Sequence, residues 1–157
     1  MQTEKIKNMI EKYSELVYKV AITRSQNIEN AEDIFQEVFM KYSQNMPEFE
    51  NEEHEKAWFI RVTINLSKNL HKQAWNRKTV ALEENLQFEE KEQENIFQIV
   101  STLPQKYKTV VYLFYYEGYK IKEISKIMKT REGTIKTWLS RARESLREKI
   151  EGGFENE

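Results

Sequence analysis

The sequence of 157 residues contains no cysteine, only four glycines and only two prolines. Without cysteine, the chain forms neither a disulfide bond nor a thiolate zinc site. Scarce glycine and proline favour long helices over many tight hairpin turns. No apolar run approaches the roughly 20 residues of a membrane span, and the first residues lack the apolar core of a signal peptide. We therefore expect a cytoplasmic, helical protein.

Charged residues are plentiful, but a net charge of −1 conceals their arrangement in blocks. Residues 56–78 hold six Lys/Arg and no acidic residue, and residues 118–149 hold ten Lys/Arg against four Glu. Between these segments, residues 79–94 hold six Glu and one Lys. Two basic segments separated by an acidic one predict two places where a polyanion binds.

Apolar residues recur at helical spacing in the first half of the chain, which predicts three amphipathic helices. The first is indicated by Ile6, Met9, Ile10, Tyr13, Leu16, Val17 and Val20. The second covers residues 31–42, with Asn30 as its N-cap. A polar loop over residues 45–56 leads to the third helix, over residues 58–75.

The second half begins with residues 79–94, which have no sustained amphipathic period and predict a flexible acidic linker. From Gly152 onward the chain is expected to fray. The fold class is therefore all-α, with two small helical domains over residues 1–78 and 95–157. The helices predicted in the second domain, with a break at Gly118, cover residues 96–102, 104–116, 120–128 and 130–147.

The last two helices have the order of a helix-turn-helix motif. Lys129 begins the predicted turn, Thr130 is the candidate N-cap of the second helix, and Gly133 suits a close approach of the two helices. The apolar face of the second helix comprises Ile135, Trp138, Leu139, Ala142, Leu146 and Ile150. The outward side chains, which can meet base edges and phosphates in a DNA major groove, are Thr134, Lys136, Thr137, Ser140, Arg141 and Arg143. A solvated amphipathic helix in a bundle has the same pattern.

Residues 103–147 resemble the C-terminal promoter-reading domain of bacterial RNA polymerase sigma factors of the extracytoplasmic-function (ECF) group. The resemblance implies that the outward side chains contact the upstream (−35) promoter element. Trp138 stands where the family commonly has an arginine. The matching residues are Leu103-Pro104, Glu123-Ile124, Gly133-Thr134 and Arg141-Ala142-Arg143.

The first domain matches the same family independently. Residues 30–44, "NAEDIFQEVFMKYSQ", are similar to the helix that docks on the β′ clamp of RNA polymerase. The resemblance implies that the polymerase-binding residues are Asp33, Gln36, Glu37 and Phe39. In this interpretation Phe39 anchors the partner, whereas Phe35 belongs to the core.

Residues 57–78, "AWFIRVTINLSKNLHKQAWNRK", resemble the helix that reads the downstream (−10) element. Asparagine can read base edges because it carries both a donor and an acceptor, and Lys and Arg hold phosphates. In the preceding loop, Phe49 and Asn51 are candidates for holding a flipped base, although five nearby Glu would repel phosphate. The implied −10 residues are Arg61, Asn65, Lys68, Asn69 and Lys72.

The resemblance also implies partners: core RNA polymerase, promoter DNA and an anti-sigma factor of the kind that is often membrane-bound. Residues 110–116, with Tyr112 or Tyr115 exposed, would dock on the flap of the β subunit; alternatively, all the aromatic side chains of this segment belong to the core. No cofactor, metal or small-molecule substrate is implied.

The sequence also bears on two other classes of protein, an enzyme and a stand-alone DNA-binding regulator. An enzyme is disfavoured because His54 and His71 lack metal-binding spacing, and the sequence has no glycine-rich phosphate loop or nucleophile elbow. A stand-alone helix-turn-helix repressor or activator stays open. It predicts a dimer that binds DNA without polymerase, and it leaves Asp33, Asn65 and Asn69 unexplained.

Overall fold

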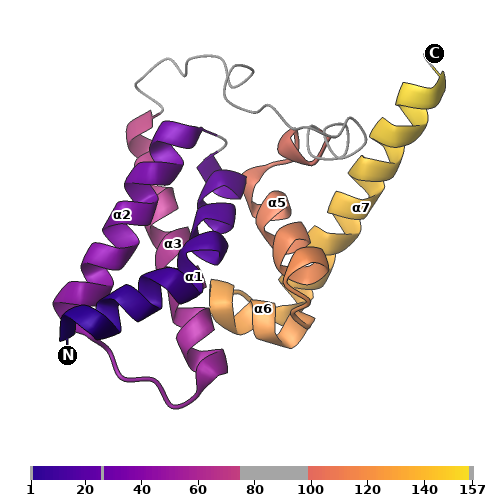
Figure 1. Ribbon diagram of the computed structural model, residues 1–157. Coiled ribbons are helices and arrows are strands. Elements are labelled where there is room, and N and C mark those ends of the chain that lie inside the picture. Colours follow the sequence, from indigo (N-terminus) through magenta and orange to yellow (C-terminus); the bar gives the residue numbers. More distant parts are fainter. Residues whose placement is uncertain (1, 26, 75–98, 156–157) are drawn as a thin grey trace. The chain divides into compact units, whose positions relative to one another are not determined.

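The computed structural model describes residues 2–25, 27–74 and 99–155, with the backbone alone for residues 70–74 and 152–155. Every regular element in these ranges is helical, which confirms the all-α prediction. The chain divides into two units, Met1–Asn85 and Leu86–Glu157 (Figure 1). The predicted linker, residues 79–94, lies outside the described residues, so the domain limits at 78 and 95 stay a prediction.

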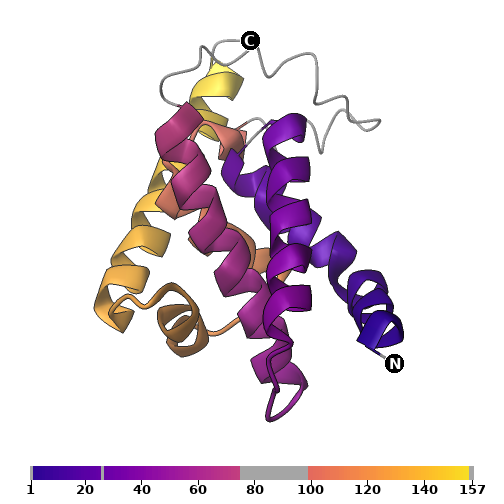
Figure 2. The same cartoon turned by 90° about the vertical axis from the view of Figure 1, so that its left-hand side faces the viewer.

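The first unit consists of three helices, α1 (Gln2–Ser25), α2 (Ile28–Asn45) and α3 (Glu52–Ala74), each packed against the other two (Figure 2). Phe59 of α3 is fully buried among aromatic rings from all three helices. Its ring centroid lies 4.5 Å from that of Tyr13 and 5.5 Å from that of Tyr42. The apolar face predicted for the first helix therefore faces the core.

The start of α2 differs from the prediction. Asn27 has an extended backbone, and its side chain accepts a hydrogen bond of 3.2 Å from the backbone N–H of Asn30. Asn27 is therefore the N-cap, and the prediction that Asn30 fills this place is wrong. Asparagine is a favoured N-cap residue, so the sequence alone does not distinguish Asn27 from Asn30. The extended backbone of Asn27 decides between them.

The loop before α3 is shorter than predicted, because α3 begins at Glu52. The side chain of Asn51 accepts a hydrogen bond of 2.8 Å from the backbone N–H of His54, which caps the new helix. Lys12 of α1 makes ion pairs of 2.6 Å with Glu52 and 2.9 Å with Glu55. The hydrogen bond from Lys12 holds the pKa of the Glu52 carboxyl below its ordinary value. Acidic residues expected in a loop thus stabilise a helix N-terminus and join it to α1.

The second unit contains α5 (Gln105–Val111), a π-helical turn η2 (Tyr112–Tyr116), α6 (Ile121–Met128) and α7 (Glu132–Glu155). Both α5 and α6 pack against α7. The helix α7 continues past Gly152 to Glu155, and the fraying expected from Gly152 onward stays a prediction. The fully or nearly fully buried apolar side chains are Leu103, Val110, Val111, Tyr112, Leu113, Ile124, Ile127, Ile135, Leu139 and Ala142.

Gly118 follows η2 and has the left-handed backbone conformation, with φ of 72°. A residue in this conformation interrupts a helix, which confirms the break predicted at Gly118. An added Cβ there would meet no atom within 4 Å, so the cost of a side chain is that of the backbone alone. We expect Gly118→Ala to lower the free energy of unfolding by about 1–2 kcal/mol. Urea denaturation followed by circular dichroism measures this change.

Gly133 supplies the matched control. It lies in α7, and an added Cβ would likewise meet nothing within 4 Å, so the predicted close helix approach at Gly133 is wrong. Gly133→Ala should raise stability by up to about 1 kcal/mol, because alanine is the better helix former. Denaturation midpoints that move in the same direction for both substitutions would contradict the backbone explanation.

Candidate nucleic-acid and partner-binding surfaces

The turn between α6 and α7 confirms the predicted helix-turn-helix. Glu123 accepts a hydrogen bond of 2.9 Å from the backbone N–H of Lys120 and so closes the start of α6. Lys129 ends α6 in the left-handed conformation, with φ of 51°. The Thr130 hydroxyl donates to the carbonyl of Met128, and the Thr130 N–H donates to the carbonyl of Ser125. Thr130 therefore closes the turn, and the prediction that it is the N-cap of α7, which begins at Glu132, is wrong.

The helix α7 buries a narrow face of Ile135, Leu139 and Ala142. The predicted apolar face is only partly correct, because Trp138 and Leu146 are half-buried and Ile150 is 42% exposed. The predicted DNA-binding side chains lie outside the buried face, where Thr134 is half-buried and the other five are exposed. At 3.6 residues per turn they form two rows, one of Lys136, Ser140 and Arg143 and one of Thr134, Thr137 and Arg141.

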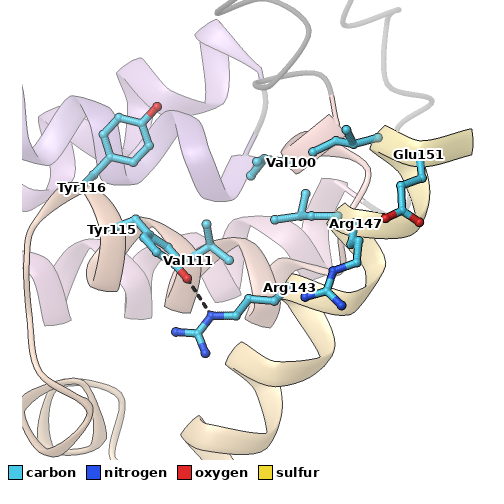
Figure 3. A pocket seen from close by; sticks show the side chains of 9 residues that line it. Val100, Val111, Tyr115, Tyr116, Arg143, Arg147 and Glu151 are labelled. Atoms are coloured by element: carbon cyan, nitrogen blue, oxygen red, sulfur yellow. Dashed lines mark hydrogen bonds between the residues drawn. The ribbon is translucent and has the colours of Figure 1, made fainter. Parts of the chain in front are cut away.

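In the row of Lys136, Ser140 and Arg143, the Arg143 side chain contacts residues of η2. The Arg143 Nε donates a hydrogen bond of 2.6 Å to the Tyr115 hydroxyl (Figure 3). Its guanidinium lies 5.4 Å from the centroid of the Phe114 ring and 5.6 Å from that of Tyr115. Arg141, in the other row, is exposed. The two arginines therefore differ in their surroundings, although both are outward on the helix.

A groove of about 470 Å³, called here the α5–α7 groove, opens beside Arg143 (Figure 3). Tyr115 and Tyr116 on its edge are 55% and 77% exposed. Tyr112 is buried and donates a hydrogen bond of 2.7 Å to Glu117, so the prediction that Tyr112 can be an exposed docking residue is wrong and only the Tyr115 alternative remains. The groove is lined by Val100, Val111, Tyr115, Tyr116, Arg143, Leu146, Arg147, Ile150 and Glu151.

In the first unit, α2 presents Asp33, Gln36 and Glu37 together, and all three are exposed. Phe39 is not on this surface: it is 6% exposed and lies 5.6 Å, between ring centroids, from Phe59. Its predicted role as an anchor for a partner is therefore wrong, since its ring belongs to the core.

Met40 is the large apolar side chain that α2 does expose, to 57%. It follows Asp33, Gln36 and Glu37 by seven, four and three residues, so it lies on the same face of the helix. The sequence interpretation missed it. The signal was the spacing itself, which places residues 33, 36, 37 and 40 in one row, whereas residue 39 falls outside that row.

On α3, Asn65, Lys68 and Asn69 are exposed and Arg61 is half-buried. The Lys72 side chain lies outside the described residues. The opposite side of α3 is buried, and Ser67 there accepts a hydrogen bond from Arg24 of α1. Burial lowers the pKa of Arg24 to about 10, which leaves it charged at neutral pH. This contact, together with buried side chains such as Phe59 and Thr63, sets the rotation of α3 and hence the direction of its polar face.

The loop candidates for a flipped base have structural contacts instead. The Phe49 ring packs edge-on against His54 and Trp58, with centroids 5.4 Å and 5.8 Å away. Asn51 caps α3, as described above. Both residues therefore order the start of α3.

Basic side chains outside the predicted set also reach the surface of the second unit. These exposed residues of α6 and the following turn are Lys122, Lys126, Lys129 and Arg131. The first helix of a helix-turn-helix crosses the DNA backbone, so these positions are suited to phosphates. The basic block over residues 118–149 was the sequence signal for them.

Two further observations concern other kinds of site. Among the described residues, no three His, Asp or Glu side chains gather as metal ligands would. No helix in the described part of the chain is long and apolar enough to cross a membrane.

Comparisons with known proteins match both units. The family model "Sigma-70 region 2" matches residues 9–77, and "Sigma-70, region 4" matches residues 93–146. The RNA polymerase sigma factor SigV of Bacillus subtilis is 30% identical over 137 residues, which cover 83% of this chain and 81% of SigV. The ECF RNA polymerase sigma factor SigW of the same organism is 26% identical over 163 residues, which cover 91% and 87%.

A solved structure is similar in fold. It is the sigma factor RpoE in complex with the anti-sigma factor NepR from Bartonella quintana. The match has a TM-score of 0.74 at 21% identity, and it covers 94% of this chain and 98% of the other.

Proposed function

Because this chain belongs to the ECF group of RNA polymerase sigma factors, we propose that its two units bind polymerase and promoter through the surfaces described above. The chain directs core RNA polymerase to specific promoters and so takes part in initiating transcription. The observation that carries this function is the match of two sigma-70 regions, in order, to two separate units of one chain.

For the polymerase, the proposed contact is the exposed face of α2. Carboxylates there can pair with basic residues on the β′ clamp, and Asp33 and Glu37 supply two of them beside Gln36. Met40 supplies the apolar contact that a protein interface places near its centre. We name Asp33, Gln36, Glu37 and Met40 the clamp face.

For the promoter, the proposed −10 surface is the polar face of α3, with Arg61, Asn65, Lys68, Asn69 and Lys72. Its asparagines read base edges and its basic residues hold phosphates. The proposed −35 surface is the outer side of α7. On that helix Arg141 is the proposed base contact, and Lys136 and Arg143 are proposed phosphate contacts.

The α5–α7 groove is the proposed site for the β flap. It combines an apolar floor with the exposed rings of Tyr115 and Tyr116, which is the composition of a protein-binding surface. We also propose an anti-sigma factor as a partner, in keeping with the complex known for the structural relative. Such a partner would silence the chain by covering the clamp face and the DNA-binding helices.

The chain has no proposed reaction of its own. It acts as a specificity subunit, and the polymerase carries out the chemistry. Since a sigma factor works where core polymerase meets the chromosome, we propose that the chain is cytoplasmic.

Promoter binding should depend on polymerase. Two modules gain avidity only when their spacing is fixed, and core RNA polymerase supplies that constraint. We expect the free chain to be mostly monomeric and to bind promoter DNA poorly at physiological salt, whereas addition of core enzyme produces a specific complex. Gel-shift titration of one promoter fragment, with and without core enzyme, measures this difference.

The same titration tests the alternative class. A promoter fragment with both elements scrambled serves as the control for non-specific binding. Tight, sequence-specific binding by the isolated chain as a dimer would instead identify a stand-alone helix-turn-helix regulator.

A further inference from the structure

Arg143 of α7 is held by a side chain from another helical segment of the same unit. Its Nε donates to the hydroxyl of Tyr115, which lies 28 residues earlier in the chain. The guanidinium also lies close to the rings of Phe114 and Tyr115, at 5.4 Å and 5.6 Å from their centroids. Arg143 therefore has three contacts that limit its movement before any DNA arrives.

These contacts do not use the terminal nitrogens of the Arg143 guanidinium, which are the atoms that would bind a phosphate. A guanidinium has five N–H donors, and the bond to Tyr115 uses the one on Nε. The terminal nitrogens point away from the Tyr115 hydroxyl (Figure 3). They carry the other four donors, which suit two hydrogen bonds to one phosphate.

Tyr115 belongs to the π-helical turn η2, whose other tyrosines have defined contacts. Tyr112 is buried and donates to Glu117, and the Tyr116 ring packs edge-on against Tyr112 at 5.6 Å between centroids. Turns of this kind are uncommon, and they occur frequently at functional sites. Tyr115 itself packs edge-on against the Phe114 ring, at 5.0 Å between centroids, and its hydroxyl accepts from Arg143 of α7.

We propose that Tyr115 is a positioning residue that orients Arg143 for contact with a DNA phosphate at the −35 element. A long, exposed arginine loses rotamer freedom when it binds phosphate, and a side chain already held at Nε loses less. The inference rests on the proposed function, in which the outer side of α7 lies against DNA. It adds to that function a tyrosine that contacts no DNA and yet strengthens DNA binding.

The experiment is a double-mutant cycle on the full chain. Holoenzyme is formed with Tyr115→Phe, with Arg143→Ala and with both changes, at saturating core enzyme, and its affinity for promoter DNA is measured over a salt series. We expect Tyr115→Phe to weaken binding about two- to tenfold, which is the effect of losing one hydrogen bond. Arg143→Ala should weaken binding and lower the salt slope by about one. The double variant should bind as Arg143→Ala alone does.

Tyr107→Phe on α5 is the matched control, since it removes the same hydroxyl group from a tyrosine of the same unit that lies outside the groove lining, and it should leave DNA affinity unchanged. The proposal is overturned if Tyr115→Phe has no effect, or if it weakens binding equally with and without Arg143, because Tyr115 would then act through the groove. A wild-type affinity and salt slope for Arg143→Ala would contradict the phosphate contact itself. That last result would also remove the basis for the proposal, and it is distinguishable from a failure of Tyr115 alone.

Discussion

Replacing Asp33, Gln36 and Met40 together by alanine is expected to reduce the affinity of the chain for core RNA polymerase by about 30-fold or more. The three side chains lie on one face of α2 and are exposed, with Met40 at 57%. The change removes a carboxylate, an amide and the apolar centre of the clamp face at once. A titration of labelled chain with core enzyme, followed by fluorescence anisotropy, measures the loss.

Folding should be nearly unaffected, since exposed positions on a helix contribute at most about 1 kcal/mol together. Glu15→Ala on α1 is the matched control, because it also removes one exposed carboxylate from the first unit and lies outside the clamp face. An unchanged affinity in the triple variant, with the control also unchanged, would show that polymerase binds elsewhere.

The second large effect concerns Arg141. Replacing it by alanine is expected to weaken binding of holoenzyme to the promoter by about 1–3 kcal/mol and to relax the preference at one or two positions of the −35 element. Arg141 is exposed in the row with Thr137, away from the groove where Arg143 is held. Transcription from a set of promoters with single changes in the −35 element measures the preference.

Lys136→Ala is the matched control for Arg141→Ala, since both remove one positive charge from an exposed position of α7. A phosphate contact carries no sequence information, so this change should weaken binding to all promoters evenly and lower the salt slope by about one. Neither side chain belongs to the buried face of Ile135, Leu139 and Ala142, so the unit should stay folded. Identical promoter preferences for wild type and Arg141→Ala would remove Arg141 from the list of base contacts.

The sequence by itself determined the elements and the family. Helical periodicity predicts α1, α2, α3 and the helix-turn-helix because it depends only on residues that are neighbours along the chain. Gly118 predicts a break for the same reason, since its left-handed backbone is a local property. The motifs in both halves of the chain are also local, and the two matched regions agree with them.

The exact ends of helices were less predictable. Asn27 and Asn30 are both good capping residues, and the extended backbone of Asn27 makes it the N-cap. Glu52 and Glu55 belong to a helix rather than a loop, and Lys12, about 40 residues earlier, pairs with both. Where a helix begins therefore depends in part on side chains from distant parts of the chain, which a local sequence pattern does not include.

Only the tertiary structure decided which aromatic and basic side chains are exposed and able to contact a partner or DNA. Phe39 and Met40 are adjacent in sequence, but Phe39 is buried against the rings of Phe35 and Phe59, whereas Met40 is on the surface. Tyr112 and Tyr115 are similarly close, and the π-helical turn buries one and exposes the other. Arg141 and Arg143 match the same motif, yet only Arg143 meets Tyr115, from a segment 28 residues away. Burial and side-chain pairing across helices arise from packing between distant segments, so periodicity gives the face of a helix but not what covers it.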